Sequence, residues 1–282
     1  MANSFFSNLK RLLSSVRPVQ VTLENKVVSP CSLLDGKVAV VTGASRGIGF
    51  VLARTFVNQG ATVIAVARNQ ANLEKARTNI NSNRYIPVAF DLTEIDDFPK
   101  LLARIKDAVP AKQIDVLVNA AGIKNGQEER YWKFTSSEFD GVVAVNVKAP
   151  FFLSRMIAEE MINNSIKGHI VNVIGIKGSI PEASPYSISK FGLMSMTQGM
   201  ARLLAPKGII VNGISPGATI TDMSGLPKDN HYYNGTPNGR AADPQEIANI
   251  ALFLVSGMAD NMVGSIVVCD GGEMLQYQNK RF

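Results

Sequence analysis

A tyrosine and a lysine four residues apart, Tyr186 and Lys190, are the side chains in this sequence best suited to proton transfer. A spacing of four puts both side chains on one face of a helix. A free phenol has a pKa of about 10, and a neighbouring ammonium group lowers that pKa because it favours the phenolate. We therefore expect Tyr186, assisted by Lys190, to exchange a proton with a carbonyl or alcohol oxygen.

A second candidate site lies in the stretch TGASRGIG (42–49), where Gly43, Gly47 and Gly49 separate an apolar run from a helical pattern. Residues without a Cβ let the backbone turn sharply and approach a pyrophosphate closely. The helix that follows presents free N–H groups and the positive end of its dipole to the phosphates. Between a strand and an amphipathic helix, these glycines predict a dinucleotide-binding turn.

The adenosine ribose of such a cofactor is expected at the end of the next apolar run, 62–67. An acidic residue there suits a free 2′-hydroxyl, whereas arginine suits a 2′-phosphate. This run is followed by Arg68 and Asn69, and Ser45 and Arg46 in the glycine turn add a hydroxyl and a second cation. Guanidinium groups pair well with phosphate oxygens, so the sequence favours NADP(H) over NAD(H). The alternative is that Arg68 is a solvated surface residue.

Short apolar runs separated by longer segments of helical periodicity must position these residues. The runs span 37–42, 62–67, 85–90, 114–118, 169–174, 208–214 and 265–269. Strands that alternate with helices form a parallel sheet covered by helices on both faces. We therefore predict an α/β fold with one domain over 34–282 and a seven-stranded parallel sheet. The stretch 224–239, rich in Pro, Gly and Asn, is expected to be a loop that serves as a substrate lid.

Composition limits the class of protein. The chain has 282 residues, of which 46% are apolar, enough for one sizeable core. No window reaches the ~18 uninterrupted apolar residues that a membrane span needs. The excess of 29 basic over 23 acidic residues suits an anionic cofactor and is too small to indicate a nucleic-acid partner. With two cysteines and two histidines, neither a disulfide framework nor a metal centre is expected, and a reducing, cytoplasmic location fits best.

Residues 1–33 differ in character from the rest of the chain. No acidic residue precedes Glu24, whereas Lys10, Arg11 and Arg17 are basic and apolar residues recur at helical spacing. This basic amphipathic extension fits three interpretations. It is a helix that docks on the body or on a second subunit, a membrane-surface anchor, or a targeting peptide.

Together, the motifs resemble those of the short-chain dehydrogenase/reductase family over nearly all of residues 34–274. The motifs are TGASRGIG (42–49), DLT (91–93), NAAG (119–122), VNVKAPF (145–151), YSISK (186–190), NGISPGATITDM (212–223) and GSIVVCDGG (264–272). The resemblance implies a Rossmann-type, doubly wound fold. It also implies hydride transfer between a nicotinamide cofactor and a small-molecule carbonyl or alcohol, usually in a homotetramer or homodimer.

The resemblance further implies roles for individual residues. Asn146 matches the asparagine that anchors a proton-relay water, and Lys190 matches the lysine that bonds the nicotinamide ribose. Asp91, with Leu92 beside it, matches the acid that binds the adenine amino group. The remaining cofactor-binding positions are Ile48 in the glycine turn, Asn119, Ala120 and Gly122 beside the ribose, and Pro216, Gly217, Thr219 and Thr221 beside the carboxamide.

One part of the family's site is missing from this sequence. The family has a serine just after the fifth strand that hydrogen-bonds the substrate oxygen, and alignment places Gly175 there. Counting back from Tyr186 by the family's usual separation reaches Val173, which has no hydroxyl either. Ser179, or with less support Ser184, is the candidate replacement. Alternatively, the substrate, a water or another side chain fills the role, or the chain binds NADP(H) with little turnover.

The sequence therefore predicts an NADP(H)-dependent oxidoreductase that interconverts a carbonyl and a secondary alcohol. Two alternatives stay open: an NADP(H)-binding regulatory or scaffold subunit, and a 3-oxoacyl-carrier-protein ketoreductase whose acidic carrier would suit a basic surface. Polar and aromatic residues after Gly122 and in the 224–239 loop favour a polar substrate. A sugar derivative or a carboxylated or acylated carrier compound would fit this description.

Overall fold

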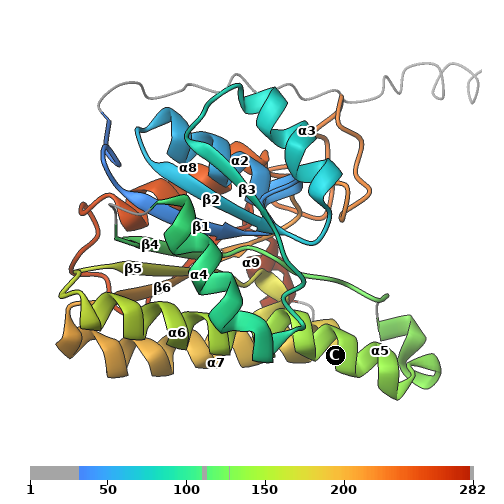
Figure 1. Ribbon diagram of the computed structural model, residues 1–282. Helices are drawn as coiled ribbons and strands as arrows, with labels where there is room; N and C mark the ends of the chain where they lie inside the picture. The colour runs from blue at the N-terminus through green and yellow to red at the C-terminus, as the bar shows by residue number, and fades with distance from the viewer. Residues whose placement is uncertain (1–31, 110–112, 127, 280–282) are drawn as a thin grey trace, which may run out of the picture.

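The computed structural model describes residues 32–109, 113–126 and 128–279. The basic amphipathic extension predicted over residues 1–33 therefore lies outside the described residues, apart from Ser32 and Leu33. Where the chain is described, a central sheet lies between two layers of helices (Figure 1).

The described part of the chain forms a parallel sheet of seven strands in the order β3-β2-β1-β4-β5-β6-β7. The strands are β1 (Val38–Thr42), β2 (Thr62–Ala67), β3 (Tyr85–Ala89), β4 (Val116–Asn119), β5 (His169–Val173), β6 (Ile210–Pro216) and β7 (Ile266–Cys269). Each strand coincides closely with the apolar run that predicted it, so the doubly wound parallel sheet is confirmed. The strand order changes direction between β1 and β4, and ligands of such sheets bind there, outside the carboxyl ends of the strands.

Helices cover both faces of this sheet, with α2, α3 and α8 on one face and α4, α6 and α7 on the other (Figure 1). The helices are α2 (Gly47–Asn58), α3 (Gln70–Ile80), α4 (Phe98–Ala108), α5 (Ser136–Val143), α6 (Ala149–Asn163), α7 (Pro185–Leu204), α8 (Pro244–Val255) and α9 (Glu273–Asn279). The short turns are η1 (Ile95–Asp97), η2 (Glu128–Lys133), η3 (Ala144–Lys148), η4 (Ile176–Gly178) and η5 (Ala205–Lys207). The crossover helices thus return the chain to the same edge of the sheet, where all strand ends meet.

Side chains along β1 show how the two layers are held. Ala39 and Val41 pack in a core cluster with residues of α2 and α8, whereas Val38 and Val40 pack in a second cluster with residues of α4 and α6. All four side chains are completely buried. Burying an aliphatic side chain of valine size or larger stabilises the fold by about 1.5–3 kcal/mol. The strand ends that carry the site are therefore anchored from both faces.

The segment Ser136–Asn163, formed by α5, η3 and α6, is long and apolar enough by length and composition to cross a membrane, with a mean hydropathy of 1.3. In the folded chain it is a core helix, because Leu153, Ile157 and Met161 on α6 are buried in the cluster against the sheet. Core helices of water-soluble domains pass the same composition test. The segment therefore gives no argument for a membrane location.

The loop predicted at 224–239 contains no helix or strand, and it packs against the segment after β7. Asn238 N donates to the Gly271 carbonyl at 3.2 Å. A Cβ on Gly271 would lie 2.5 Å from Asn238 Oδ1, and a Cβ on Gly272 would lie 2.9 Å from Pro237, so only glycines permit this contact. The loop is thereby held beside the cleft, and its movement as a lid stays a prediction.

Candidate active site

A two-part cleft opens at the carboxyl ends of the strands. The first part has a volume of about 390 Å³ and lies between the glycine turn and the ends of β2 and β3. The second part, of about 440 Å³, lies between β5, α7 and the end of β6. Residues that line both parts are Ala120, Gly122, Thr221 and Met223. The cleft is therefore continuous and long enough to hold an extended ligand across the switch point of the sheet.

The glycine turn forms the floor of the first part. A Cβ on Gly43 would lie 2.9 Å from the Ala121 backbone, and one on Gly49 would lie 2.4 Å from the Gly43 carbonyl, so both approaches require glycine. Gly47 has φ +57°, a conformation that side chains other than glycine rarely adopt. Thr42 Oγ1 accepts hydrogen bonds from Ala120 N and Ala121 N, each at 3.1 Å, and so ties the turn to the end of β4.

The N-terminus of α2 fits an anionic ligand. Its N-cap residue, Arg46, makes no side-chain capping bond, and the first turn contains no acidic residue. The free N–H groups and the helix dipole therefore favour a phosphate at this point. With the tight glycine turn, this is a structural reason to expect a dinucleotide in the cleft.

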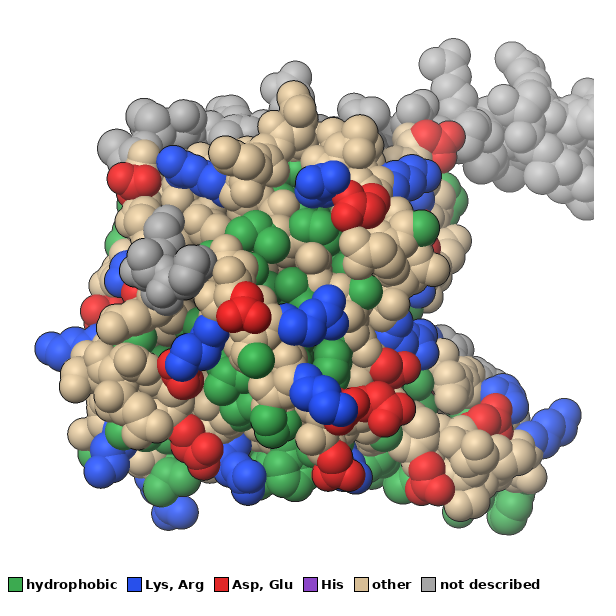
Figure 2. Space-filling model, viewed as in Figure 1, with side chains coloured by type: hydrophobic (Ala, Val, Ile, Leu, Met, Phe, Trp, Pro, Cys, Tyr) green, Lys and Arg blue, Asp and Glu red, His purple; other side chains and the backbone are tan. Residues whose placement is uncertain are grey.

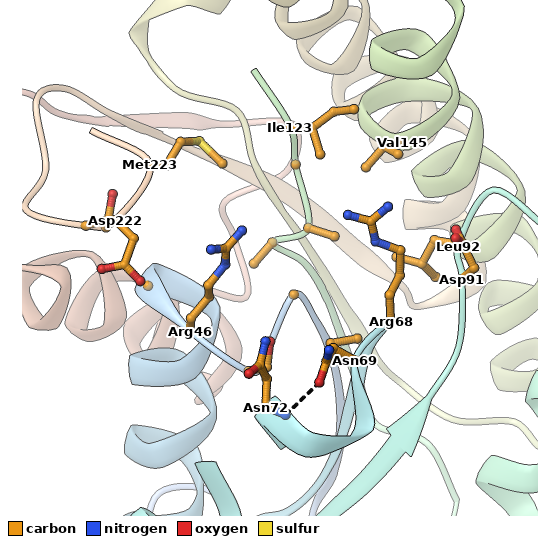
Figure 3. A pocket seen from close by; sticks show the side chains of 18 of the residues that line it. Arg46, Arg68, Asn69, Asn72, Asp91, Leu92, Ile123, Val145, Asp222 and Met223 are labelled. Atoms are coloured by element: carbon orange, nitrogen blue, oxygen red, sulfur yellow. Dashed lines mark hydrogen bonds between the residues drawn. The ribbon is translucent and has the colours of Figure 1, made fainter. Parts of the chain in front are cut away.

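Two guanidinium groups reach into the first part of the cleft, Arg46 from the glycine turn and Arg68 from the end of β2 (Figure 3). Neither forms an ion pair with a residue of the described chain. Asn69 uses its Oδ1 to accept from Asn72 N at 2.9 Å and so caps α3. Asp91 Oδ1 accepts from both the N–H and the hydroxyl of the residue two positions later, at 2.9 Å each, so its carboxylate is fixed at the cleft wall.

Most of the predicted cofactor residues line the cleft. In the first part lie Gly43, Ser45, Arg46, Gly47, Arg68, Asn69, Asp91, Leu92, Ala120, Gly122 and Thr221. In the second part lie Ile48, Tyr186, Lys190, Pro216, Gly217 and Thr219. Gly49 and Asn119 lie outside the lining. Asn119 is buried and donates to Ser154 Oγ and Asn172 Oδ1, at 2.9 and 2.8 Å, so its side chain joins β4 to α6 and β5.

Tyr186 and Lys190 both line the second part, one helical turn apart near the start of α7. Lys190 Nζ lies 5.6 Å from the centroid of the Tyr186 ring and donates to the Val173 carbonyl at 3.0 Å. Burial lowers the pKa of Lys190 to about 8, because charging a buried amine is costly. The predicted proton-transfer pair is therefore brought together in one buried corner.

The expected lowering of the Tyr186 pKa is wrong for the protein without a cofactor. Burial raises the pKa of Tyr186 to about 12, and the negative charge of Glu182 adds to the rise. The Lys190 ammonium donates to the Val173 carbonyl rather than to the phenolic oxygen, so it gives a phenolate no hydrogen bond. Tyr186 is consequently a neutral phenol, and hence a proton donor, at neutral pH.

Asn146 lies in η3, a π-helical turn between α5 and α6, and is completely buried. Ile123 N donates to its Oδ1 at 2.9 Å, and its Nδ2 donates to the Ile123 carbonyl and to Ser189 Oγ, each at 3.0 Å. π-Turns of this kind are frequent at functional sites. The side chain joins the segment after β4 to α7 next to Lys190, which makes Asn146 a positioning residue in this geometry.

Gly175 lies directly opposite the Tyr186 hydroxyl. Its backbone has φ +94° and ψ 153°, and a Cβ built there would lie 3.7 Å from Tyr186 Oη and 3.8 Å from the Pro216 carbonyl oxygen. This region of φ and ψ is almost restricted to glycine. The position therefore faces the reacting centre, but its backbone conformation disfavours any side chain, serine included.

Neither replacement serine reaches the Tyr186 hydroxyl. Ser179 is absent from the cleft lining and directs its hydroxyl to Met194 Sδ at 3.7 Å. Ser184 is the N-cap of α7, where its Oγ accepts from Ser187 N and donates to a Glu182 carboxylate oxygen. Ile176 and Lys177 line the cleft but Gly178 and Ser179 do not, so the structure does not support the choice of Ser179.

Sequence reasoning expected the 224–239 loop, which carries Tyr233, at the substrate end of the cleft, but it did not single out Glu273 on the wall of the second part. Glu273, Tyr233 and Lys177 line it together with Tyr186 and Gly175. Glu273 stands directly after the DGG motif, which was the only local signal for it. The short helix α9 and the packed 224–239 loop bring it and Tyr233 to the cleft, and periodicity does not predict such contacts.

Comparisons with known proteins agree with this geometry. A family model described as short chain dehydrogenase matches residues 37–230. The chain is 32% identical over 244 residues to 3-oxoacyl-(acyl-carrier-protein) reductase FabG of Vibrio harveyi, covering 85% of this chain and 98% of that protein. It is also 32% identical over 249 residues to gluconate 5-dehydrogenase of Gluconobacter oxydans (strain 621H), covering 85% of this chain and 95% of that protein.

A solved structure supports the same relationship. The crystal structure of 3-ketoacyl-(acyl-carrier-protein) reductase from Brucella melitensis complexed with NADH has a TM-score of 0.77 and 29% sequence identity to this chain. That match covers 85% of this chain and 99% of the other. The relatives named here are oxidoreductases of carbonyl or alcohol groups. The chain belongs to the short-chain dehydrogenase/reductase family of oxidoreductases.

Proposed function

We propose that the protein is an NADP(H)-dependent oxidoreductase that interconverts a carbonyl and a secondary alcohol, with Tyr186 as general acid and base. The observation that carries this proposal is the single cleft that joins an uncapped helix N-terminus at one end to the buried Tyr186–Lys190 pair at the other. A bound nicotinamide cofactor would supply the hydride.

The choice of NADP(H) rests on the charges at the ribose end. Arg46 and Arg68 both face the first part of the cleft, and β2 is followed by no acidic residue that would suit a free 2′-hydroxyl. A 2′-phosphate between two guanidinium groups would form strong charge-assisted hydrogen bonds. The NADH in the Brucella relative belongs to that protein, and in this chain the two arginines favour the phosphorylated cofactor.

In the reduction direction, Tyr186 donates its proton to the carbonyl oxygen. With its pKa raised to about 12, the phenol is protonated across the neutral range, which is the state that a general acid requires. Lys190 lies beside it and holds its ammonium group near Gly122, whose Cβ position is 3.7 Å from Nζ, which suits a contact with the nicotinamide ribose. Asn146 keeps this corner in place through Ile123 and Ser189.

The position opposite Tyr186 supplies no hydroxyl, because it is Gly175. A substrate hydroxyl or a water must therefore provide the second hydrogen bond to the carbonyl oxygen. Where neither does, the loss of one preorganised donor costs about 10²–10³ in rate. If the missing hydrogen-bond donor has lowered the rate so far that the protein no longer acts as an enzyme, the regulatory or scaffold alternative applies.

A second candidate is a 3-oxoacyl-carrier-protein ketoreductase, favoured by the names of several relatives. An acidic carrier protein would need a continuous basic surface at the cleft. On the face drawn in Figure 2, Lys and Arg side chains are interspersed with Asp and Glu. This mixed face offers no extended basic patch, and we keep the ketoreductase as the second candidate.

The proposal is tested with NADPH that carries deuterium at the transferable C4 position. Incubation with a panel of ketones should yield an alcohol with deuterium at the former carbonyl carbon, detected by mass spectrometry. NADPH binding with no deuterated product from any ketone or acetoacetyl thioester would favour the regulatory alternative. The proposal also keeps the homotetramer or homodimer and the cytoplasmic location expected from the sequence. Light scattering tests the oligomer.

A further inference from the structure

The far wall of the second part of the cleft carries polar side chains that the proton and hydride transfer do not use. They come from three separate segments: Glu273 from the start of α9, Tyr233 from the 224–239 loop, and Lys177 from η4. All three line the same cavity as Tyr186 and Gly175. Because they share this cavity with the reacting centre, they can contact the rest of a substrate.

Glu273 is held in place by the backbone around it. Its Oε2 accepts a hydrogen bond from Ala218 N at 3.2 Å, and a Cβ on Gly217 would lie 3.1 Å from the same oxygen. Asp270 caps the start of α9 by accepting from Gly272 N and Met274 N, each at 2.8 Å. In the described chain the other carboxylate oxygen, Oε1, accepts no hydrogen bond. A fixed carboxylate with one oxygen uncommitted is an acceptor for a ligand hydroxyl.

Tyr233 lines the same cavity as Glu273, on a loop that is anchored on Gly271 and Gly272. The ring packs on the Gly235 backbone, where a Cβ would lie 2.5 Å from the ring, and Tyr233 N donates to the Gly239 carbonyl at 3.0 Å. The negative charge of Glu273 raises the pKa of Tyr233, in addition to burial, whereas Lys177 lowers it. The phenol therefore lies within the field of both charged groups and stays a neutral hydrogen-bond donor.

Lys177 gives this wall a cation. Its Nζ forms an ion pair with Glu182, whose side chain is only 9% exposed, so the ammonium group is held at the cleft rather than in solvent. Lys124, an exposed residue, lines the same cavity. The wall thus offers a carboxylate acceptor, a phenol and two ammonium groups. A purely apolar substrate would cover Glu273 Oε1 and the Tyr233 hydroxyl without giving either a hydrogen bond, which is costly.

The space beside Gly175 points to the same kind of ligand. The missing Cβ leaves room 3.7 Å from Tyr186 Oη, and neither Ser179 nor Ser184 fills it. A hydroxyl on the carbon next to the substrate carbonyl would fit there. It would also supply the hydrogen-bond donor that the chain does not.

We propose that this site selects a polyhydroxylated keto acid, an inference that rests on the proposed function. Glu273 and Tyr233 bind hydroxyl groups of this substrate, and Lys177 binds its carboxylate. A hydroxyl next to the carbonyl occupies the space at Gly175. Sites built to hydrogen-bond a substrate hydroxyl discriminate strongly against analogues that lack it, because their polar groups are then unpaired. The site therefore selects its substrate by both its hydroxyl groups and its negative charge.

The test uses the full chain with NADPH and three probes: 5-keto-D-gluconate, the neutral polyol ketone L-sorbose, and cyclohexanone. The wild-type protein should reduce the keto acid with the highest kcat/KM. Glu273→Gln should lower kcat/KM for the keto acid by about 10- to 100-fold, mainly through KM, because it loses a hydrogen bond to a charged group. Cyclohexanone, which has no hydroxyl, should keep its rate.

Lys177→Met, made together with Glu182→Gln so that no buried carboxylate is left unpaired, tests the carboxylate contact. It should lower the ratio of keto acid to L-sorbose kcat/KM by about tenfold or more, since an ion pair is lost. Glu159→Gln, at a solvent-exposed position on α6 whose side chain is 63% exposed, serves as the matched control and should leave all three rates unchanged.

Two results would overturn the inference while leaving the proposed function intact. One is a wild-type protein that reduces cyclohexanone or an acetoacetyl thioester better than the keto acid. The other is a Glu273→Gln variant that loses the same factor on the keto acid and on cyclohexanone. A protein that reduces no carbonyl at all would instead refute the proposed function, and this inference with it.

Discussion

Replacing Gly175 by serine would introduce the side chain that the family resemblance implies at this position, yet the structure predicts that the replacement destabilises the protein. The backbone there has φ +94° and ψ 153°, a conformation that costs a residue with a Cβ about 1–3 kcal/mol. Crowding adds little, because the nearest atoms to a Cβ lie at 3.7 and 3.8 Å, which is ordinary contact. The cost therefore comes from the backbone, and Gly175→Ala should lose as much stability as Gly175→Ser.

Thermal and denaturant unfolding measure this prediction. For domains of similar size, each kcal/mol shifts Tm by about 2–4 °C, so both variants should melt several degrees below the wild type. The matched control is Gly199 in α7, where a Cβ would meet nothing within 4 Å and φ is not positive. There, Gly→Ala should stabilise the helix by about 0.5–1 kcal/mol. Unchanged Tm values for both Gly175 variants would refute the backbone argument, and a loss confined to serine would show that crowding by the hydroxyl dominates.

Three further predictions concern the cofactor end and the buried corner. Arg68→Ala should weaken NADPH binding about 10- to 100-fold in a fluorescence titration, because it removes a charge-assisted hydrogen bond to the 2′-phosphate. The affinity for NADH should stay nearly unchanged. Equal losses of affinity for the two cofactors would contradict the choice of NADP(H). The NADPH Kd should rise as pH increases above about 8, because Lys190 then loses its proton and with it the positive charge that favours an anionic cofactor. A Lys190→Met variant that kept this pH dependence would show that Lys190 is not its origin. Asn146→Ala should lower the free energy of unfolding by about 1–3 kcal/mol, because it leaves the partly buried Ile123 N–H without its acceptor. A wild-type Tm would show that the amide contacts are dispensable.

The parts of the fold that sequence predicts well are those set by local periodicity. β1 and β2 are short apolar runs that alternate with amphipathic helices, and such runs form the strands of a covered parallel sheet. Gly43 and Gly49 mark the turn because packing there tolerates no Cβ. The four-residue spacing of Tyr186 and Lys190 likewise fixes one face of a helix, so their meeting in the cleft follows from the spacing.

The parts that sequence does not predict depend on contacts between distant segments or on burial. Ser179 fails as a replacement hydroxyl because it lies just beyond the part of the 3-10 turn that lines the cleft and directs its hydroxyl to Met194 Sδ. The pKa of Tyr186 rises rather than falls because of desolvation and the negative charge of Glu182, and spacing carries no information on either. Glu273 reaches the site only through the turn after β7, which no periodic pattern specifies.

The central claim is that this chain reduces a carbonyl with Tyr186 as the proton donor. Its most direct test is the kcat of Tyr186→Phe relative to wild type at saturating NADPH, on the carbonyl that the wild type reduces fastest, with NADPH Kd measured on both proteins. Loss of a general acid costs about 10²–10⁴ in rate, so kcat should fall by at least about 10², with NADPH Kd close to the wild-type value because the ring that fills the buried corner is retained. A Tyr186→Phe protein that keeps the wild-type kcat would contradict the account.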